Sequence, residues 1–194
     1  MTTQPAVPLR LRPSRPDDAE RVALLHADSW RRHYRGAYAD AFLDGDVVTD
    51  RRRVWRERLA GAAAGGGVTV LAEDGAGFAG FVHVVLDADA RWGSLVDNLH
   101  VTHDRRRTGV GAALLTRAAE IVTEHANGSG PAPLYLWVQE QNTAARHFYA
   151  AMGGTTVETA PIAPPGGVPE WLNGSPRKLR VAWESATSLG RKPS

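Results

Sequence analysis

Arginine and glycine are concentrated in one short stretch of this sequence, RRRTGVGAALL, from Arg105 to Leu115. The stretch directly follows an apolar run, SLVDNLHV, from Ser94 to Val101, and its second half has the composition of a helix. Glycines at a strand-to-helix junction permit a tight turn, and they also let amide groups converge on an anion at the start of the helix. The helix macrodipole adds about half a positive charge there. The junction is therefore either a packing turn or a phosphate-binding loop.

Two common phosphate-binding motifs are excluded at this junction. A Walker loop needs G-x-x-x-x-G-K-[ST], and the sequence contains no Lys-Ser or Lys-Thr pair. A dinucleotide fingerprint needs a third glycine where Leu114 stands, and no acidic residue closes the strand that follows. The pattern that remains is R-x-x-G-x-G, formed by Arg106, Gly109 and Gly111 and flanked by Arg105 and Arg107.

A second block with its own spacing lies about thirty residues further along the chain. It reads LYLWVQEQNTAARHFYAAMGG and contains N-x-x-A-x-x-F-Y as Asn142, Ala145, Phe148 and Tyr149. With both blocks in this order, the sequence resembles the GCN5-related N-acetyltransferase superfamily. The resemblance covers about Leu9 to Trp183, and it is specific for the coenzyme and the fold but not for the acceptor.

The resemblance implies that acetyl-coenzyme A is the cosubstrate. In that family the R-x-x-G-x-G loop wraps the pyrophosphate, and the strand before it splays from its parallel neighbour. The pantetheine arm pairs with the exposed backbone in the gap. The residues expected to bind the coenzyme are Leu99, His100, Val101, Arg106, Arg107, Thr108, Gly109, Val110, Gly111, Ala112, Asn142, Arg146 and Tyr149. Asn142 is also a typical helix N-cap residue, and the two roles are compatible.

Two side chains are candidates for moving protons. Tyr149 is expected to act as the general acid that protonates the departing coenzyme A thiolate, although a helical tyrosine at this position can also be a core residue. In the family a titrating base often stands at the position of Leu95, which cannot titrate, and Asp97 follows two residues later. Asp97 is the candidate base, directly or through a water chain, and its alternative is a solvent-facing residue at a strand end. His100 and His83 are reserve candidates.

The stretch DSWRRHYRGAYADAFLD, from Asp28 to Asp44, combines aromatic and charged residues. In the family this region and the loop near Ala160 to Trp171 form the walls of the acceptor site. The residues expected to contact the acceptor are Trp30, His33, Tyr34 and Tyr38. Amphipathic helix ends that pack on a sheet would have a similar composition, so both interpretations stay open.

The elements that must position these residues follow from the hydrophobic periodicity and the chain breakers. Their order is a strand, two helices, three strands, a helix, a strand, a helix and two strands. Together with the resemblance, this order predicts an α/β (α+β) fold. We expect a mixed, mostly antiparallel central sheet of about seven strands, flanked by about four helices, with a splayed parallel pair at the coenzyme site.

One domain is expected from residue 9 to residue 184, between a flexible N-terminus, residues 1–8, and a flexible tail, residues 185–194. The 194 residues, 43% of them hydrophobic, are enough for one sizeable core. No segment approaches the ~20 consecutive apolar residues of a membrane helix, and the N-terminal segment has no apolar h-region. We therefore expect a cytoplasmic protein with no membrane partner.

The composition excludes several other classes of site. The sequence has no cysteine, so disulfides, thiolate metal sites and a cysteine nucleophile are excluded. No pair of histidines has a spacing that favours a metal site, and no metal is expected. Of the 23 basic residues only Lys178 and Lys192 are lysine, which would suit a nucleic-acid binder. A general bias towards arginine, balanced by 21 acidic residues, is the better explanation, and no nucleic-acid partner is expected.

The residues and the resemblance together predict an acyl-coenzyme A-dependent N-acetyltransferase. A primary amine, expected to belong to a small molecule, would attack the acetyl thioester directly. Two alternatives stay open: an acetyltransferase for protein N-termini or lysines, and a non-catalytic acyl-coenzyme A sensor, which Leu95 at the usual base position favours. The identity of the acceptor, the acyl chain length and the oligomeric state stay open, although relatives often pair as homodimers.

Overall fold

The computed structural model describes residues 8–61 and 67–190. Within those residues a seven-stranded sheet has the order β1-β2-β3-β4-β5-β7-β6. Strands β4 and β5 are parallel, and every other neighbouring pair is antiparallel. The strands are β1 (Arg10–Pro13), β2 (Gly67–Asp74), β3 (Gly77–Asp89), β4 (Gly93–Val101), β5 (Leu134–Gln139), β6 (Thr155–Pro161) and β7 (Arg177–Trp183). The predicted fold class, a mostly antiparallel sheet with one parallel pair, is confirmed.

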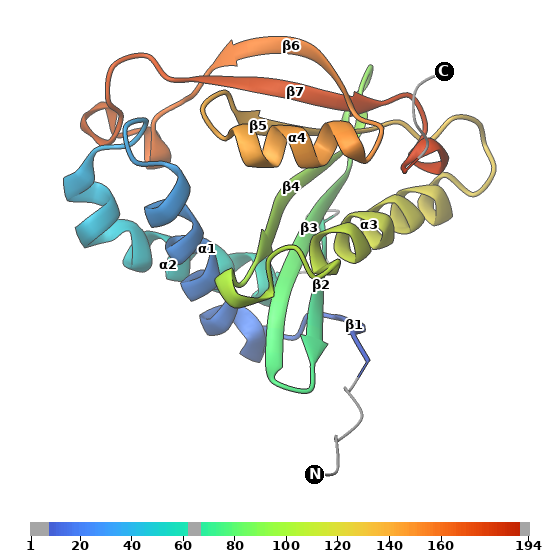
Figure 1. The fold of residues 1–194 in the computed structure, drawn as a ribbon, viewed down its shortest axis with the longest axis horizontal. Coiled ribbons are helices and arrows are strands. Elements are labelled where there is room, and N and C mark those ends of the chain that lie inside the picture. The colour runs from blue at the N-terminus through green and yellow to red at the C-terminus, as the bar shows by residue number, and fades with distance from the viewer. Residues whose placement is uncertain (1–7, 62–66, 191–194) are drawn as a thin grey trace.

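Helices cover both faces of the sheet. They are α1 (Ala19–His33), α2 (Val47–Ala60), α3 (Val110–Ala126) and α4 (Thr143–Ala151), with single helical turns η1 (Pro16–Asp18), η2 (Phe42–Asp46), η3 (His103–Arg105), η4 (Pro165–Gly167), η5 (Pro169–Trp171) and η6 (Ala186–Ser188). Figure 1 shows α1 and α2 on one side of β3 and β4, and α3 on the other side. The central strands are therefore buried on both faces, which explains their nearly continuous apolar sequences.

Alternation along β3 assigns its side chains to the two faces. Phe81 packs with Val22 and Trp55 in the core beneath α1 and α2. Val82 and Val84 belong to the larger core beneath α3 and α4. The same alternation continues into β4 and β5, so it decides which residues of those strands face the α1 side and which face the α3 side.

The folded part of the chain extends beyond the expected domain end at residue 184. The sequence places residues 185–194 in a flexible tail, but Ala186 of η6 is buried, and its amide donates to the carbonyl oxygen of Ala132 at 2.7 Å. The Gly190 amide donates to the carbonyl of Met152 at 2.8 Å. These backbone bonds hold residues 185–190 against the domain. Residues 1–7 of the expected N-terminal segment and residues 191–194 lie outside the described residues.

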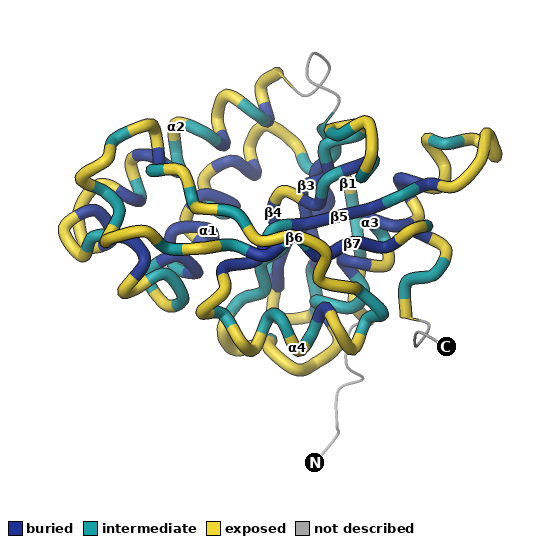
Figure 2. Tube along the Cα trace, turned by 90° about the horizontal axis from the view of Figure 1, so that it is seen from above, coloured by how far each residue is buried: buried dark blue, intermediate teal, exposed yellow. Residues whose placement is uncertain are grey.

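Burial is concentrated in the middle of the sheet. Figure 2 shows β5 and β7 largely buried, whereas the edge strand β6 is mostly exposed. No helix among the described residues is both long enough and apolar enough to cross a membrane.

Candidate active site

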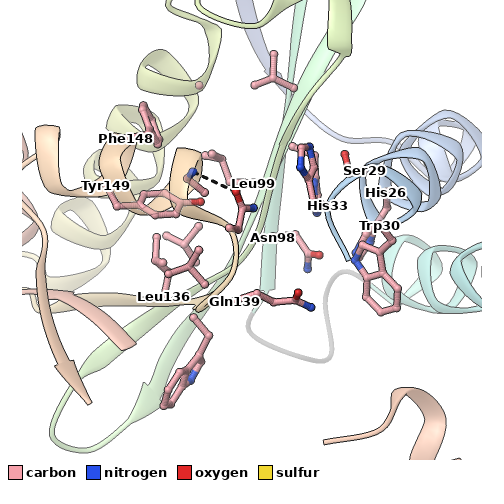
Figure 3. A pocket seen from close by; sticks show the side chains of 18 of the residues that line it. His26, Ser29, Trp30, His33, Asn98, Leu99, Leu136, Gln139, Phe148 and Tyr149 are labelled. Carbon is pink, nitrogen blue, oxygen red and sulfur yellow. Dashed lines mark hydrogen bonds between the residues drawn. The ribbon is translucent and has the colours of Figure 1, made fainter. Parts of the chain in front are cut away.

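The parallel strands β4 and β5 separate after three paired residues. Ser94, Leu95 and Val96 pair with β5 at Leu134 to Leu136, and the pairing ends there although both strands continue. A cavity of about 710 Å³ opens between the diverging ends. Figure 3 shows Leu99 and Tyr149 on one side of this space and His26, Trp30 and His33 on the other.

A β-bulge at Asp97 causes the separation. In the ladder between β3 and β4, His83 pairs with Asn98 and Val84 pairs with Val96, which leaves Asp97 as an extra residue. Such a bulge bends the strand and changes the direction of its side chains. Asn98 thus shares the α1 face with His83, and Asp97 reaches Arg58 of α2, whose guanidinium donates to its carboxylate at 2.6 Å.

The loop before α3 exposes a row of backbone amides. Arg107 and Gly109 have positive φ values of 61° and 92°, so the chain turns sharply before the helix begins. Among the described residues, no protein group accepts a hydrogen bond from the amides of residues 107–112, and the first helical bond comes from the Ala113 amide to the Gly109 carbonyl. These free donors and the positive end of the α3 dipole suit an anion.

The two glycines of this loop have different roles. The φ of 92° at Gly109 lies in a region that other residues enter only with strain. At Gly111 a β-carbon would lie 3.6 Å from Phe148 and 3.7 Å from Val101, which are ordinary contact distances. A larger side chain at Gly111 would therefore extend into the cavity instead of disturbing the core.

Helix α4 brings Asn142 and Tyr149 to the cavity. Asn142 caps the helix, because its side-chain oxygen accepts a hydrogen bond from the Ala145 amide at 3.2 Å. Tyr149 lies one to two turns later, 8% exposed, and its burial raises the pKa of the phenol. The phenol is therefore protonated at neutral pH and can donate a proton within the cavity.

Aromatic rings form the wall on the α1 side. Trp30, Tyr34 and Tyr38 contact one another with centroids 5.1 to 5.3 Å apart. Phe42 and Trp171 stack behind them at 4.2 Å. The wall thus joins α1 to the loop after β6, as the sequence predicts for an acceptor site.

A buried histidine, His26, and a half-buried one, His100, lie beside this wall. The rings of His26 and His100 are 4.6 Å apart, and the Trp55 indole donates to Nδ1 of His26 at 2.9 Å. Burial lowers the pKa of His26 well below its usual range and lowers the pKa of His100 to about 3. Both imidazoles are therefore neutral at pH 7, so they offer hydrogen bonds without charge.

The cavity brings together most of the residues singled out in the sequence. Its lining includes Trp30, His33, Tyr34, Tyr38, Asp97, Leu99, His100, Val101, Arg106, Arg107, Gly109, Gly111, Ala112, Asn142 and Tyr149. Thr108, Val110 and Arg146 do not belong to the lining. Thr108 bonds to the Arg105 carbonyl at 2.6 Å and Arg146 to the Glu140 carbonyl at 3.0 Å. Arg106 reaches across the cavity mouth and hydrogen-bonds to His33.

Other lining residues are not among the site residues predicted from the sequence. They include His26, Ser29, Arg51, Arg58, Asn98, Trp137, Gln139 and Lys178. A helical signal for two of them exists, because His26 and Ser29 share the face of Trp30 and His33 at spacings of three and four. No comparable signal marks Gln139 or Lys178, which meet only through strand pairing. Among the described residues, no cluster of three His, Asp or Glu side chains could hold a metal ion.

Known proteins with similar sequences and structures share a description. The family model of the Acetyltransferase (GNAT) family matches residues 25–153. The uncharacterized N-acetyltransferase YuaI of Bacillus subtilis strain 168 is 27% identical over 142 residues, 72% of this chain and 77% of that protein. The probable N-acetyltransferase Rv2775 of Mycobacterium tuberculosis H37Rv is 29% identical over 143 residues, 73% of this chain and 76% of that protein.

A solved structure has the same arrangement of elements. The PaiA N-acetyltransferase of Thermoplasma acidophilum, crystallised with coenzyme A, superposes with a TM-score of 0.68. The superposition covers 91% of this chain and 99% of that protein at 15% sequence identity. At this identity the likeness concerns the fold.

Proposed function

Because this chain belongs to the Acetyltransferase (GNAT) family, we propose that it transfers an acetyl group from acetyl-coenzyme A to the primary amine of a small molecule. Membership of the family makes the chain an N-acetyltransferase. The identity of its coenzyme and of its acceptor is what we propose. The observation that carries the proposal is the row of amides from Arg107 to Ala112, at one end of the cavity between β4 and β5, for which the described part of the chain supplies no acceptor.

The residues at this end of the cavity fit the coenzyme. The amides of residues 107–112 donate to no protein group among the described residues, and Arg107, Gly109, Gly111 and Ala112 line the cavity, where Arg106 and Arg107 add positive charge for a diphosphate. The edge of β4 at Leu99 and Val101, which β5 does not cover, offers backbone groups to an extended arm. Asn142 holds its cap with its oxygen, and its amide nitrogen is free to donate to the same arm.

The chemistry follows from the residues where β4 and β5 part. When bound, acetyl-coenzyme A supplies a thioester whose carbonyl carbon accepts the neutral amine of the acceptor. Backbone amides of the uncovered β4 edge stabilise the developing oxyanion, and Tyr149 protonates the leaving sulfur. Asp97 accepts the proton of the amine through a water chain, because Arg58 already holds its carboxylate.

The wall around the acceptor end favours a small molecule. Trp30 and Tyr38 are at most 9% exposed, and Trp171 of the loop after β6 stacks on Phe42 behind them. One observation favours a second candidate function, a non-catalytic acyl-coenzyme A sensor: the ion pair of Asp97 with Arg58 engages the carboxylate proposed as the base.

Calorimetry tests the coenzyme assignment. We expect acetyl-coenzyme A to bind the native protein and to bind the Gly111→Trp variant at least 100-fold more weakly, because the indole would fill the space before α3. Gly45→Trp is the matched control, since Gly45 is exposed and has no neighbour within 4 Å. Equal affinity of a folded Gly111→Trp variant would refute the loop assignment.

Thiol release from acetyl-coenzyme A in the presence of diverse amines separates the two candidate functions. An enzyme releases the thiol with at least one amine class, whereas a sensor binds the coenzyme and releases none. Binding without release across amino acids, polyamines, aminoglycosides and peptides would favour the sensor.

A further inference from the structure

The acceptor end of the cavity carries an excess of positive charge. Its charged lining residues are Arg51, Arg58, Lys178 and a single carboxylate, Asp97. Arg58 pairs with Asp97, and Arg51 pairs with Asp50, which is buried behind the wall. Lys178 is the remaining cation, and no carboxylate of the cavity lining is left to balance its charge.

Lys178 has no carboxylate partner within ion-pair distance in the described part of the chain. Its ammonium lies over the ring of Trp137 at 4.5 Å, and burial lowers its pKa. The other charged groups near it are engaged elsewhere: Glu158 with Arg180 at 2.8 Å, and Asp97 with Arg58. A half-buried cation without a counter-ion is costly, so an anion that entered the cavity would bind favourably beside Lys178.

Gln139 stands directly across from Lys178 in the pairing of β5 with β7. The Gln139 side chain is buried, at 7% exposure, and lies near the Tyr38 hydroxyl. Neither its amide oxygen nor its amide nitrogen has a partner with normal hydrogen-bond geometry among the described residues. Figure 3 shows this amide directed towards Asn98 and Trp30, across the gap between β5 and β4. Buried amides are almost always paired in folded proteins, so an unpaired one that lines a cavity is available to hydrogen-bond a molecule that enters it.

Strand alternation places both residues on the acceptor side. Leu136 and Val138 of β5 and Leu179 of β7 belong to the core beneath α3 and α4. Gln139 and Lys178 therefore face the opposite side, where α1 and the aromatic wall lie. One cation and one amide thus stand side by side at the end of the cavity remote from the α3 loop.

We propose that Lys178 and Gln139 bind the carboxylate of the acceptor, so that the substrate is a small amine that also bears a carboxylate, such as an amino acid. This inference rests on the proposed acetyl transfer. The ammonium of Lys178 pairs with the carboxylate, and the Gln139 amide nitrogen donates to it. The aromatic wall of Trp30, Tyr34 and Tyr38 contacts the apolar part of the acceptor. Polyamines and aminoglycosides are disfavoured, because their several positive charges meet Lys178 and Arg51.

Matched amines that differ only in the carboxylate test the proposal. L-phenylalanine with phenethylamine, and L-tryptophan with tryptamine, are titrated into the protein saturated with coenzyme A to measure binding. In separate reactions that contain acetyl-coenzyme A, their acetylation is followed by mass spectrometry. We expect each amino acid to bind and react at least tenfold better than its decarboxylated partner. Spermidine should be the poorest acceptor.

Variants assign the preference to the two residues. Lys178→Met should abolish the preference for the amino acid without changing coenzyme affinity, Lys178→Arg should retain part of it, and Gln139→Leu should weaken it. Arg117→Met, which removes an exposed cation of α3, is the control and should have no effect.

Three results would overturn the proposal. They are equal binding of phenethylamine and phenylalanine, an unchanged preference in Lys178→Met, and acetyl-coenzyme A binding with no detectable binding of any carboxylate-bearing amine at millimolar concentration. Failure of the proposed function is distinguishable, because the protein would then either bind no acetyl-coenzyme A or bind it and release no thiol with any amine class.

Discussion

The two ends of the cavity are formed by different chemical groups, one mainly by backbone amides and the other by side chains. The coenzyme end is made mainly of backbone amides from one continuous segment, residues 107–112, with glycines that leave them accessible. The acceptor end is made of side chains from α1, α2, β4, β5, β7 and the loops between them. A contiguous backbone site has a sequence motif, whereas a site assembled from distant side chains has none. The comparison explains why the sequence indicates the coenzyme and leaves the acceptor open.

The two ends also differ in the charged and neutral groups that line them. The amides before α3 attract an anion with partial charges and with arginines that water reaches. The proposed acceptor end holds neutral imidazoles, with the tilted rings of His26 and His100 in contact beside the aromatic wall. The proposed phosphate site therefore relies on partial charges and exposed arginines, whereas the proposed acceptor site combines neutral imidazoles with one half-buried ammonium, that of Lys178. Substitutions at either end of the cavity, or at residues between the two ends, would test this contrast.

Tyr149 lies where the two ends meet, and its removal should have the largest effect. We expect Tyr149→Phe to lower kcat about 100-fold, because a positioned general acid typically contributes at least that factor. The KM for acetyl-coenzyme A should stay unchanged, since the ring that packs in the core is retained. Steady-state thiol release measures both parameters.

Tyr135→Phe provides the matched control for Tyr149→Phe. Tyr135 is also buried, on β5, but it lies outside the cavity lining, so loss of its hydroxyl should leave kcat unchanged. A Tyr149→Phe enzyme with native turnover would remove Tyr149 from the mechanism and reduce it to a core residue.

Acid should destabilise the side of the sheet that bears α1 and α2. His83 is buried there against Trp55, and burial lowers its pKa to about 4, compared with about 6.5 in an unfolded chain. Between these values the unfolded chain binds the proton and the folded chain does not. Stability is therefore lost as the pH falls through this range. We expect His83 alone to lower the free energy of unfolding by about 2 kcal/mol between pH 7 and pH 5.

Urea denaturation at the two pH values measures this loss. The His83→Gln variant should lose about 2 kcal/mol less than the native protein over the same range. His147→Gln is the control, because His147 is exposed on α4 and should not affect the difference. If His83→Gln had the full native pH dependence, His83 would not be neutral in the folded protein.

The same difference between local and non-local contacts explains which features could be predicted from the sequence. The periodic segments predict the fold, because apolar alternation and breakers act locally, and both motifs fall on the elements that line the cavity. The bulge at Asp97 was beyond prediction in detail, because it depends on how β4 pairs with β3. Gln139 and Lys178 could not be predicted for the same reason, because only the register of β5 with β7 makes them neighbours. The sequence did not indicate that residues 185–190 are held against the domain, because their contacts are backbone bonds to Ala132 and Met152.

The smallest effect is expected at Asn142, where one side chain has a structural and a proposed binding role. Its oxygen caps α4 through the Ala145 amide, and we propose that its nitrogen donates to the coenzyme arm. Asn142→Ala removes both groups, so it should cost about 1 kcal/mol of stability and weaken acetyl-coenzyme A binding several-fold. Asn142→Asp keeps the oxygen and loses the donor, so the thermal midpoint should stay near the native value while the affinity falls. Native coenzyme affinity in Asn142→Asp would mean that this residue serves the helix alone, and that the coenzyme end of the cavity depends on backbone groups even more fully than the comparison implies.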